Sequence, residues 1–346
     1  MKKTIPSKTL YIFCEQFSAM LKVGIQLEFA LEAAIEQTTD RRMKKILFMA
    51  LKKIDEGSTL CEAFDSTNAF PPIFINMIEA GEITGSLDHS FDSLTLFFKK
   101  QGELKSKISK AFLQPCIVVI LMIVVTGLFM FKILPSFESV FEFSGARLPE
   151  QTQNILNLRI FILENKKRIL ILLPSCIILL KALLNIKLVK YLKDMLMLYN
   201  PLTHRITVAL VNMRFANTLS MMLQSGIYLL EAIEVSSKCT NNTFAESQIL
   251  KLQEPINNGE PLFSSMTNKK VFGLILRRMV QTGEETGYLE SMLKKSADFY
   301  EADSNRLLDQ IITIIEPISL FLIAIPLSYL AIAVAMPMFS LFLQYL

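Results

Sequence analysis

The sequence contains one segment twice, at a constant offset of 202 residues. Residues 13–141 align without a gap to residues 215–343, and about 27 of these 129 positions carry the same residue in both copies. A long repeat at a fixed offset indicates two copies of one structural unit. We therefore expect both copies to fold in the same way and in the same order along the chain.

Each copy ends in an apolar tract that is long enough to cross a membrane. Residues 111–131 contain no charged residue, and at 1.5 Å per residue they extend about 31 Å. Residues 317–346 are also free of charge. With 51% hydrophobic and 20% charged residues overall, the composition favours an integral membrane protein over a soluble globule.

A third, weaker apolar tract lies between the two copies. Residues 169–180 are apolar, and they can cross a membrane only if Lys181 extends towards the interface and residues 182–186 complete the helix. Two copies in the same orientation need a return crossing between them, which favours a span here. The predicted order is a first repeat at 1–110, spans at 111–134, 168–186 and 311–337, an outer loop at 135–167, a second repeat at 187–310 and an outer tail at 338–346.

The distribution of basic residues predicts the orientation of this arrangement. A lysine cluster precedes the first span, which places the N-terminus and both repeats in the cytoplasm and the C-terminus outside. That cluster consists of Lys99, Lys100, Lys105, Lys107 and Lys110. A second basic cluster at residues 166–168 would then lie on the outer side, and it keeps a two-span topology open. No cleavable signal is recognised at the N-terminus.

Composition also argues against several classes of function. A net charge of +4 is too small for a nucleic-acid-binding surface. The five cysteines form no C-x-x-C pair and the two histidines, His89 and His204, are far apart, so we expect no metal site, disulfide framework or catalytic histidine network. The sequence therefore offers no candidate cofactor-binding residue.

Each copy has the pattern of an all-α fold. Apolar residues recur at helical spacing, and Gly24 in the first copy and Gly226 in the second are placed to end a helix in the left-handed conformation. Gly57 and Gly259 mark a further break. We expect six short helices in each copy, packed as an antiparallel bundle, with the last helix running into the membrane.

The most specific local feature is a short segment present in both copies. It comprises Gly81, Glu82, Thr84 and Gly85 in the first copy, and Gly283, Glu284, Thr286 and Gly287 in the second. This pattern predicts a helix that ends at the first glycine and a threonine that caps the next helix. The segment is either a turn that needs only these backbone angles, or an acidic surface in which Glu82 and Glu284 contact a partner.

Prolines and one carboxylate mark the apolar tracts. Pro115 and Pro135 recur as Pro317 and Pro337, and we expect the prolines to kink or open the spans. Glu316 precedes Pro317 near the start of the last span. A carboxylate at membrane depth is a candidate functional residue, although Glu316 could equally lie at the wet interface.

The doubled Gly-Glu-x-Thr-Gly-x-Leu segments belong to a longer series of motifs. The others are Leu-Pro-Ser-Phe at 134–137, Leu148-Pro149 with Thr152, Ile315-Glu316-Pro317, and Met336-Pro337-x-Phe339. In this order the chain resembles the inner-membrane platform proteins of type IV pilus and type II secretion machines, the PilC-like or F-type family. The resemblance covers residues 13–342.

The resemblance implies a bacterial inner-membrane protein with two cytoplasmic helical bundles and three spans, which forms a homo-oligomer. It also implies a function without catalysis. The platform would dock a cytoplasmic assembly or retraction ATPase and couple its movements to the incorporation of pilin or pseudopilin, beside other inner-membrane assembly proteins and membrane lipid.

Two other functions are compatible with parts of the pattern. A small transporter can be built from repeats with proline-broken spans, but three spans are few and the centres of the expected spans carry no charge. An intramembrane protease needs paired aspartates or a nucleophile with its base, and none of the expected spans contains an Asp.

Overall fold

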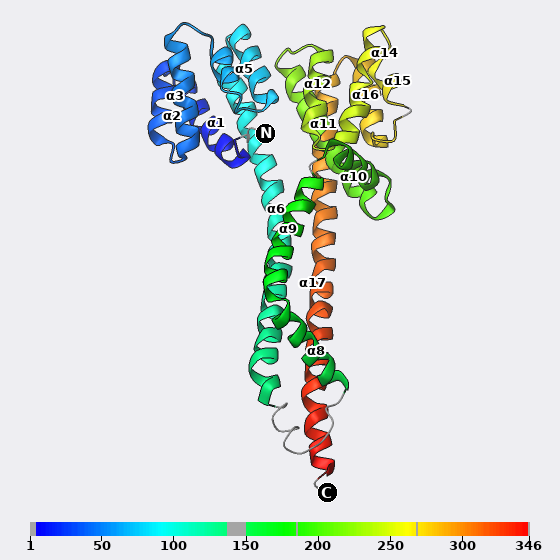
Figure 1. Cartoon of the computed structure of the whole chain (residues 1–346). Helices are drawn as coiled ribbons and strands as arrows, with labels where there is room; N and C mark the ends of the chain where they lie inside the picture. Colours follow the sequence, from blue (N-terminus) through cyan, green and yellow to red (C-terminus); the bar gives the residue numbers. More distant parts are fainter. Residues whose placement is uncertain (1–4, 137–149, 185, 268, 345–346) are drawn as a thin grey trace. The chain divides into compact units, whose positions relative to one another are not determined.

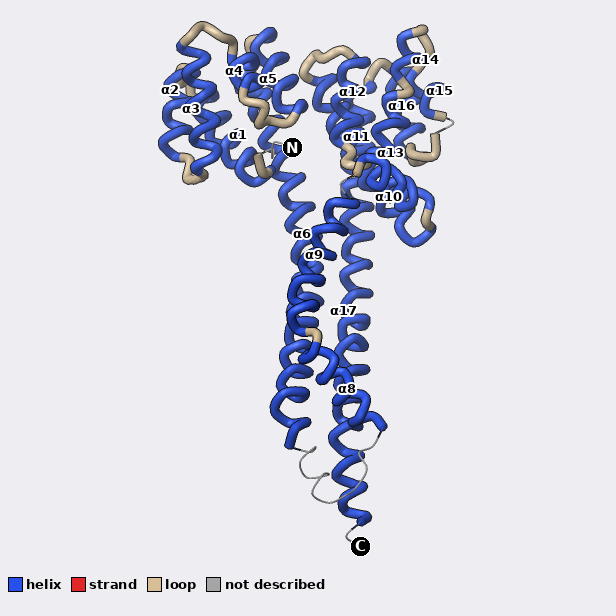
Figure 2. The backbone as a smooth tube through the Cα atoms, viewed as in Figure 1, coloured by secondary structure: helices blue, strands red, loops and turns tan. Residues whose placement is uncertain are grey.

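A computed structural model describes residues 5–136, 150–184, 186–267 and 269–344 of the chain (Figure 1). Over these ranges the secondary structure is α-helical, with one π-helical segment and no strand (Figure 2). The expected all-α fold is confirmed. The chain divides into two compact units, the repeat unit (Met1–Lys107 with Lys190–Leu307) and the apolar unit (Ile108–Val189 with Leu308–Leu346).

The first repeat is a bundle of six helices. Its elements are α1 (Ser7–Lys22), α2 (Leu27–Gln37), α3 (Arg41–Asp55), α4 (Leu60–Ser66), α5 (Pro72–Thr84) and the first part of α6 (Leu87–Leu128). A cluster of phenylalanines fills the core, and the ring centroids of Phe70 and Phe74 lie 4.4 Å apart while those of Phe17 and Phe91 lie 4.5 Å apart. Such pairs add about 0.5–1.5 kcal/mol each beyond the area they bury.

The ends of these helices follow from particular residues. Asp40 accepts hydrogen bonds from the backbone N–H groups of Arg42 and Met43 at the start of α3. Thr59 and Glu62 form a capping box at the start of α4. Gly24 adopts a φ of 84° just beyond α1, a left-handed conformation that a residue with a Cβ rarely adopts, and Gly226 in the second repeat has a φ of 80°. Both glycines therefore end a helix as predicted.

The second repeat follows the same plan at the same offset. Its helices are α11 (Pro201–Gln224), α12 (Leu229–Cys239), α13 (Thr243–Leu250), α14 (Gln253–Asn257), α15 (Leu262–Met266), α16 (Leu274–Thr286) and the first part of α17 (Leu289–Gln344). The bounds of α12 and α16 are those of α2 and α5 plus 202. The expected count of six is wrong here, because the counterpart of α3 is divided into α13 and α14.

The second repeat also carries an additional helix, α10 (Lys187–Tyr199). Leu198 of α10 packs with Phe244 and Val271 in a small apolar cluster. The buried carboxylate of Asp194 accepts hydrogen bonds from the backbone N–H and the hydroxyl of Thr243, each at 2.8 Å. This carboxylate therefore fixes α10 to the start of α13.

The apolar unit contains the rest of α6 and α17, together with the π-helical segment η1 (Phe129–Ile133), α8 (Glu150–Glu164) and α9 (Lys166–Leu184). Phe129 and Met130 pack with Ile155 of α8 and Leu330 of α17. The hydroxyl of Thr152 donates to the carbonyl of Ala333 at 2.9 Å. The expected outer loop is thus partly helical, because α8 has apolar residues to bury; residues 137–149, with Phe137, Leu148 and Pro149, lie outside the described residues.

The prolines interrupt these helices less than the sequence suggests. Pro115 lies inside α6, and Pro317 and Pro337 lie inside α17, without a break in the helix assignment. The described departure is η1, which ends two residues before Pro135. A proline removes one i to i−4 hydrogen bond, and a π-turn is one way to re-pair the backbone around it. The described helices are therefore not opened at Pro115, Pro317 or Pro337, and the expected kinks stay a prediction.

Among the described residues, three helical segments are long and apolar enough to cross a membrane. They are Leu87–Ser136, Pro201–Gln224 and Leu289–Met336. The first and third contain the spans expected at 111–134 and 311–337, and only 17% of the most apolar window is buried in each. In the second, which is α11, 61% of that window is buried, as suits a core helix of the second repeat. The middle span expected at 168–186 is helical as far as Leu184, the end of α9, and this helix carries four basic residues.

Two glycine substitutions are expected to change stability in opposite directions. A Cβ at Gly283 would lie 2.8 Å from the Cα of Leu289, whereas a Cβ at Gly102 in α6 would meet nothing within 4 Å. Gly283→Ala should destabilise the protein by about 1–3 kcal/mol through overpacking. Gly102→Ala should stabilise it by up to about 1 kcal/mol, because alanine favours helix. Thermal unfolding of the detergent-solubilised protein, followed by circular dichroism, measures both, and equal effects would contradict this packing.

Candidate functional site

The paired Gly-Glu-x-Thr-Gly segments lie at the ends of α5 and α16. The predicted helix end at Gly81 and Gly283 is wrong, because both helices continue to Thr84 and Thr286 and end at Gly85 and Gly287. The φ angles of these last two glycines are 69° and 76°. The hydroxyls of Thr84 and Thr286 donate to the carbonyl four residues earlier, within their own helix, instead of capping the next helix.

The first glycine of each segment has a packing role. A Cβ at Gly81 would lie 2.5 Å from the Oγ of Ser90 and 3.2 Å from the Cα of Leu87. The Cβ at Gly283 would meet Leu289, as described above. The absence of a side chain therefore allows α5 to lie close to the start of α6, and α16 to lie close to the start of α17.

The glutamate that follows each glycine binds the start of a neighbouring helix. Glu82 accepts hydrogen bonds from the backbone N–H of Leu60 at 2.6 Å and of Cys61 at 3.0 Å, the first two residues of α4. Glu284 accepts the same two bonds at the start of α15, from Leu262 at 2.6 Å and Phe263 at 2.8 Å. A carboxylate at a helix N-terminus satisfies unpaired N–H groups and complements the helix dipole.

These contacts add a third interpretation to the two that the sequence left open. Glu82 and Glu284 are half-buried and already bound within the chain. Their direct contact with a partner stays a prediction. Sequence reasoning missed this role, although one signal existed. Pro261 lies just before α15 and has no side chain that can cap the helix, so another group has to bind the first N–H groups. The glutamate 23 residues later is present in both copies.

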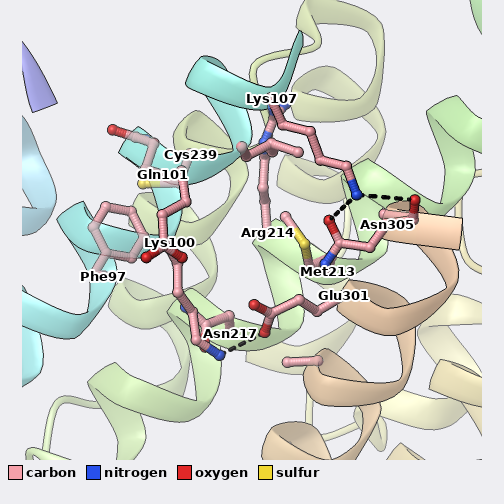
Figure 3. Close-up of a pocket in the computed structure, with 14 residues that line it drawn as sticks. Phe97, Lys100, Gln101, Lys107, Met213, Arg214, Asn217, Cys239, Glu301 and Asn305 are labelled. Atoms are coloured by element: carbon pink, nitrogen blue, oxygen red, sulfur yellow. Dashed lines mark hydrogen bonds and ion pairs between the residues drawn. The ribbon is translucent and has the colours of Figure 1, made fainter. Parts of the chain in front are cut away.

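A cavity of about 280 Å³ lies inside the repeat unit, where the two repeats meet (Figure 3). It lies between α6 of the first repeat and α11 and α17 of the second. Lys100 forms an ion pair with Glu301 at 2.5 Å across it, and Lys107 donates to the carbonyl and side chain of Asn305 at 3.3 and 3.4 Å (Figure 3). These polar contacts join the two repeats.

Two groups in the wall of this cavity are partly withdrawn from water. One terminal N–H of Arg214 donates to the carbonyl of Thr240 at 2.9 Å, and burial lowers the pKa of its guanidinium. Burial raises the pKa of the Cys239 thiol to about 11. Among the described residues, no group of three or more His, Cys, Asp or Glu side chains could hold a metal ion.

The remaining candidate with a charge, Glu316, belongs to the part of α17 that lies in the apolar unit. Glu316 lies on an exposed side of α17 in the single chain, one residue before Pro317. The structure does not assign it a role, and its function at membrane depth stays a prediction.

The glutamate caps generate a stability prediction that compares the two repeats. Glu82→Ala and Glu284→Ala should each destabilise the protein by about 1–3 kcal/mol, since two charge-assisted hydrogen bonds are lost. The loss should be larger for Glu284→Ala, because α4 keeps its Thr59 cap and α15 has none. Glu285→Ala, which changes the exposed neighbour, is the matched control. Thermal unfolding measures all three; equal midpoints for Glu284→Ala and the control would contradict the cap.

The raised pKa of Cys239 predicts slow alkylation. Only the thiolate reacts, and it is the form that burial disfavours, so at pH 8 Cys239 should react about a hundredfold more slowly than an exposed thiol introduced as Lys251→Cys. The rate should rise about tenfold per pH unit below pH 11. Iodoacetamide labelling of the folded protein, read by peptide mass spectrometry, measures it, and labelling as fast as at position 251 would contradict the prediction.

Comparison with known proteins gives the family of this fold. The model of the family described as "Type II secretion system (T2SS), protein F" matches residues 13–135 and again residues 215–337, which reproduces the offset of 202. The chain is 28% identical over 338 residues to the type IV pilus assembly protein PilC of Myxococcus xanthus, covering 97% of this chain and 81% of the relative. It is 27% identical to PilC of Pseudomonas aeruginosa (98% and 91% covered) and 26% identical to the type II secretion system protein F of Vibrio cholerae (98% and 84% covered). With two matched copies and similarity along nearly its whole length, this chain belongs to the type II secretion system protein F family.

Proposed function

We propose that the chain is an inner-membrane platform of a type IV pilus or type II secretion machine. In this proposal it docks a cytoplasmic assembly ATPase and couples its movements to the incorporation of pilin or pseudopilin subunits. The relatives' names supply the kind of machine, namely type IV pilus assembly or type II secretion. The observation that carries the coupling is that each repeat shares one continuous helix with the apolar unit.

The first of these helices is α6. Its early residues Phe91, Leu94 and Phe98 are fully buried in the core of the first repeat, and the same helix continues through the charge-free residues 111–128. In the second repeat, α17 buries Leu293 and Ala297 in the core and then enters its own apolar stretch. A closely packed core moves as a body, so displacement of a repeat would displace the start of its apolar helix.

The proposed topology has three crossings, with the N-terminus in the cytoplasm and the C-terminus outside. The return crossing is assigned to α9, whose 19 residues carry three basic residues at the start and Lys181 near the end. Long basic side chains at helix ends can extend to the membrane interface, which makes a short span possible. The platform would be a homo-oligomer that also contacts lipid and other assembly proteins.

Co-purification with the hexameric assembly ATPase of the same cell tests the docking proposal. The detergent-solubilised chain should retain the ATPase. Ile83→Lys asks whether the repeated Gly-Glu-x-Thr-Gly segments lie in the contact, and it leaves the glutamate caps in place, because it changes a side chain that is 80% exposed beside Glu82. Glu285→Lys makes the equivalent change beside Glu284.

Three results are informative. Loss of the ATPase with Ile83→Lys or Glu285→Lys, at unchanged thermal stability, would place the turn in the docking surface. Retention by both variants would support the platform and restrict the turns to a structural role. Failure of the wild-type chain to retain the ATPase would contradict docking.

A further inference from the structure

The two repeats contact each other head to tail, through different faces. Helix α5 of the first repeat lies beside α12 of the second (Figure 1). The side-chain amide of Asn76 donates to the carboxylate of Glu231 at 3.0 Å, and the hydroxyl of Ser225 lies 3.5 Å from the sulfur of Met77. Because unlike faces meet, the contact is heterologous and leaves one matching face unused at each end.

The offset of 202 identifies those two unused faces. The counterpart of α12 in the first repeat is α2, and the counterpart of α5 in the second repeat is α16. In Figure 1 these two helices lie on opposite sides of the contact between α5 and α12. The two faces differ in burial: Met77, which lies beside Ser225 of the second repeat, is fully buried, whereas its counterpart Met279 on α16 is only partly buried.

The side chains on these faces suit each other. Helix α2 exposes Phe29, which is 61% exposed, beside Glu28, Glu32 and Glu36, and it contains no basic residue. The counterpart of Asn76 on α16 is Arg278, which is exposed, and Arg277 precedes it. The observed contact of α5 with α12 pairs Asn76 with Glu231. In a matching contact of α16 with α2, Arg278 takes the place of Asn76 and Phe29 takes the place of Glu231, so Arg278 would lie against Phe29. An arginine there can lie over the aromatic ring and pair with the adjacent carboxylates.

We propose that a second copy of this chain places its α2 on α16, head to tail, and so continues the contact that joins the two repeats within one chain. Helices α6 and α17 begin at matched residues, Leu87 and Leu289. The contact deepens the homo-oligomer part of the proposed function and does not depend on ATPase docking.

Cross-linking in native membranes tests the pairing. Val23 and Met279 are the counterparts of Ser225 and Met77, so one tagged chain carries Val23→Cys and a second, differently tagged chain carries Met279→Cys. A short thiol cross-linker should join the two unlike chains, above the background that native cysteines give when either variant is mixed with wild type. A product formed only between two Val23→Cys chains would show a two-fold contact and overturn the proposal, as would the absence of any product.

Charge exchange tests the specificity of the same surface. Glu32→Arg and Arg278→Glu should each lower co-purification of two differently tagged chains at least about threefold, because like charges then face each other. The chain with both substitutions should recover it, since each reversed residue meets its reversed partner. Lys251→Glu makes the same charge change as Arg278→Glu on another surface and should have no effect.

These experiments separate this inference from the proposed function. Cross-linking is measured in cells with and without the assembly ATPase, and the product should form in both. If ATPase retention is lost while cross-linking stays intact, the result contradicts the docking proposal and leaves the contact between α2 and α16 standing. Intact retention without cross-linking, or a double variant that shows no recovery, would overturn the contact between α2 and α16.

Discussion

Each repeat depends on one close approach between two helices. Gly81 lets α5 lie against the start of α6, and Gly283 lets α16 lie against the start of α17. The next residue along each helix is the glutamate that binds the N-terminus of α4 or α15. A single helix end therefore fixes two neighbours at once, one by the absence of a side chain and the other by a carboxylate on backbone N–H groups.

The two repeats use this common scaffold with different surfaces. The first has a threonine cap at α4, whereas the second has Pro261 and relies on the glutamate. The second also adds α10, which Asp194 fixes to α13. On the outer faces, the exposed acidic residues of α2 contrast with the arginines of α16. Because core positions constrain each other more than surface positions do, a duplicated fold can keep its packing while its faces come to suit different contacts.

The apolar helices continue past their prolines. Pro115 and Pro317 lie within continuous α6 and α17, and a π-helical segment precedes Pro135. The lost hydrogen bond is local, and neighbouring turns can adjust to it. The same helices contribute their first turns to the core of a repeat, which is the physical basis for the proposed coupling.

The sequence by itself determined the two matched units, their helical class, the glycines that end helices and the first and last apolar segments. These features depend on residue spacing and on charge-free length, both of which are local properties of the chain. Tertiary structure alone decided that Glu82 and Glu284 bind helices 21 or 22 residues earlier, that Gly81 lies inside a helix, and that residues 150–164, which were expected in a loop, pack as α8. It also decided that unlike faces of the repeats meet, because contacts between distant segments depend on how whole helices pack and leave no periodic signal in the sequence.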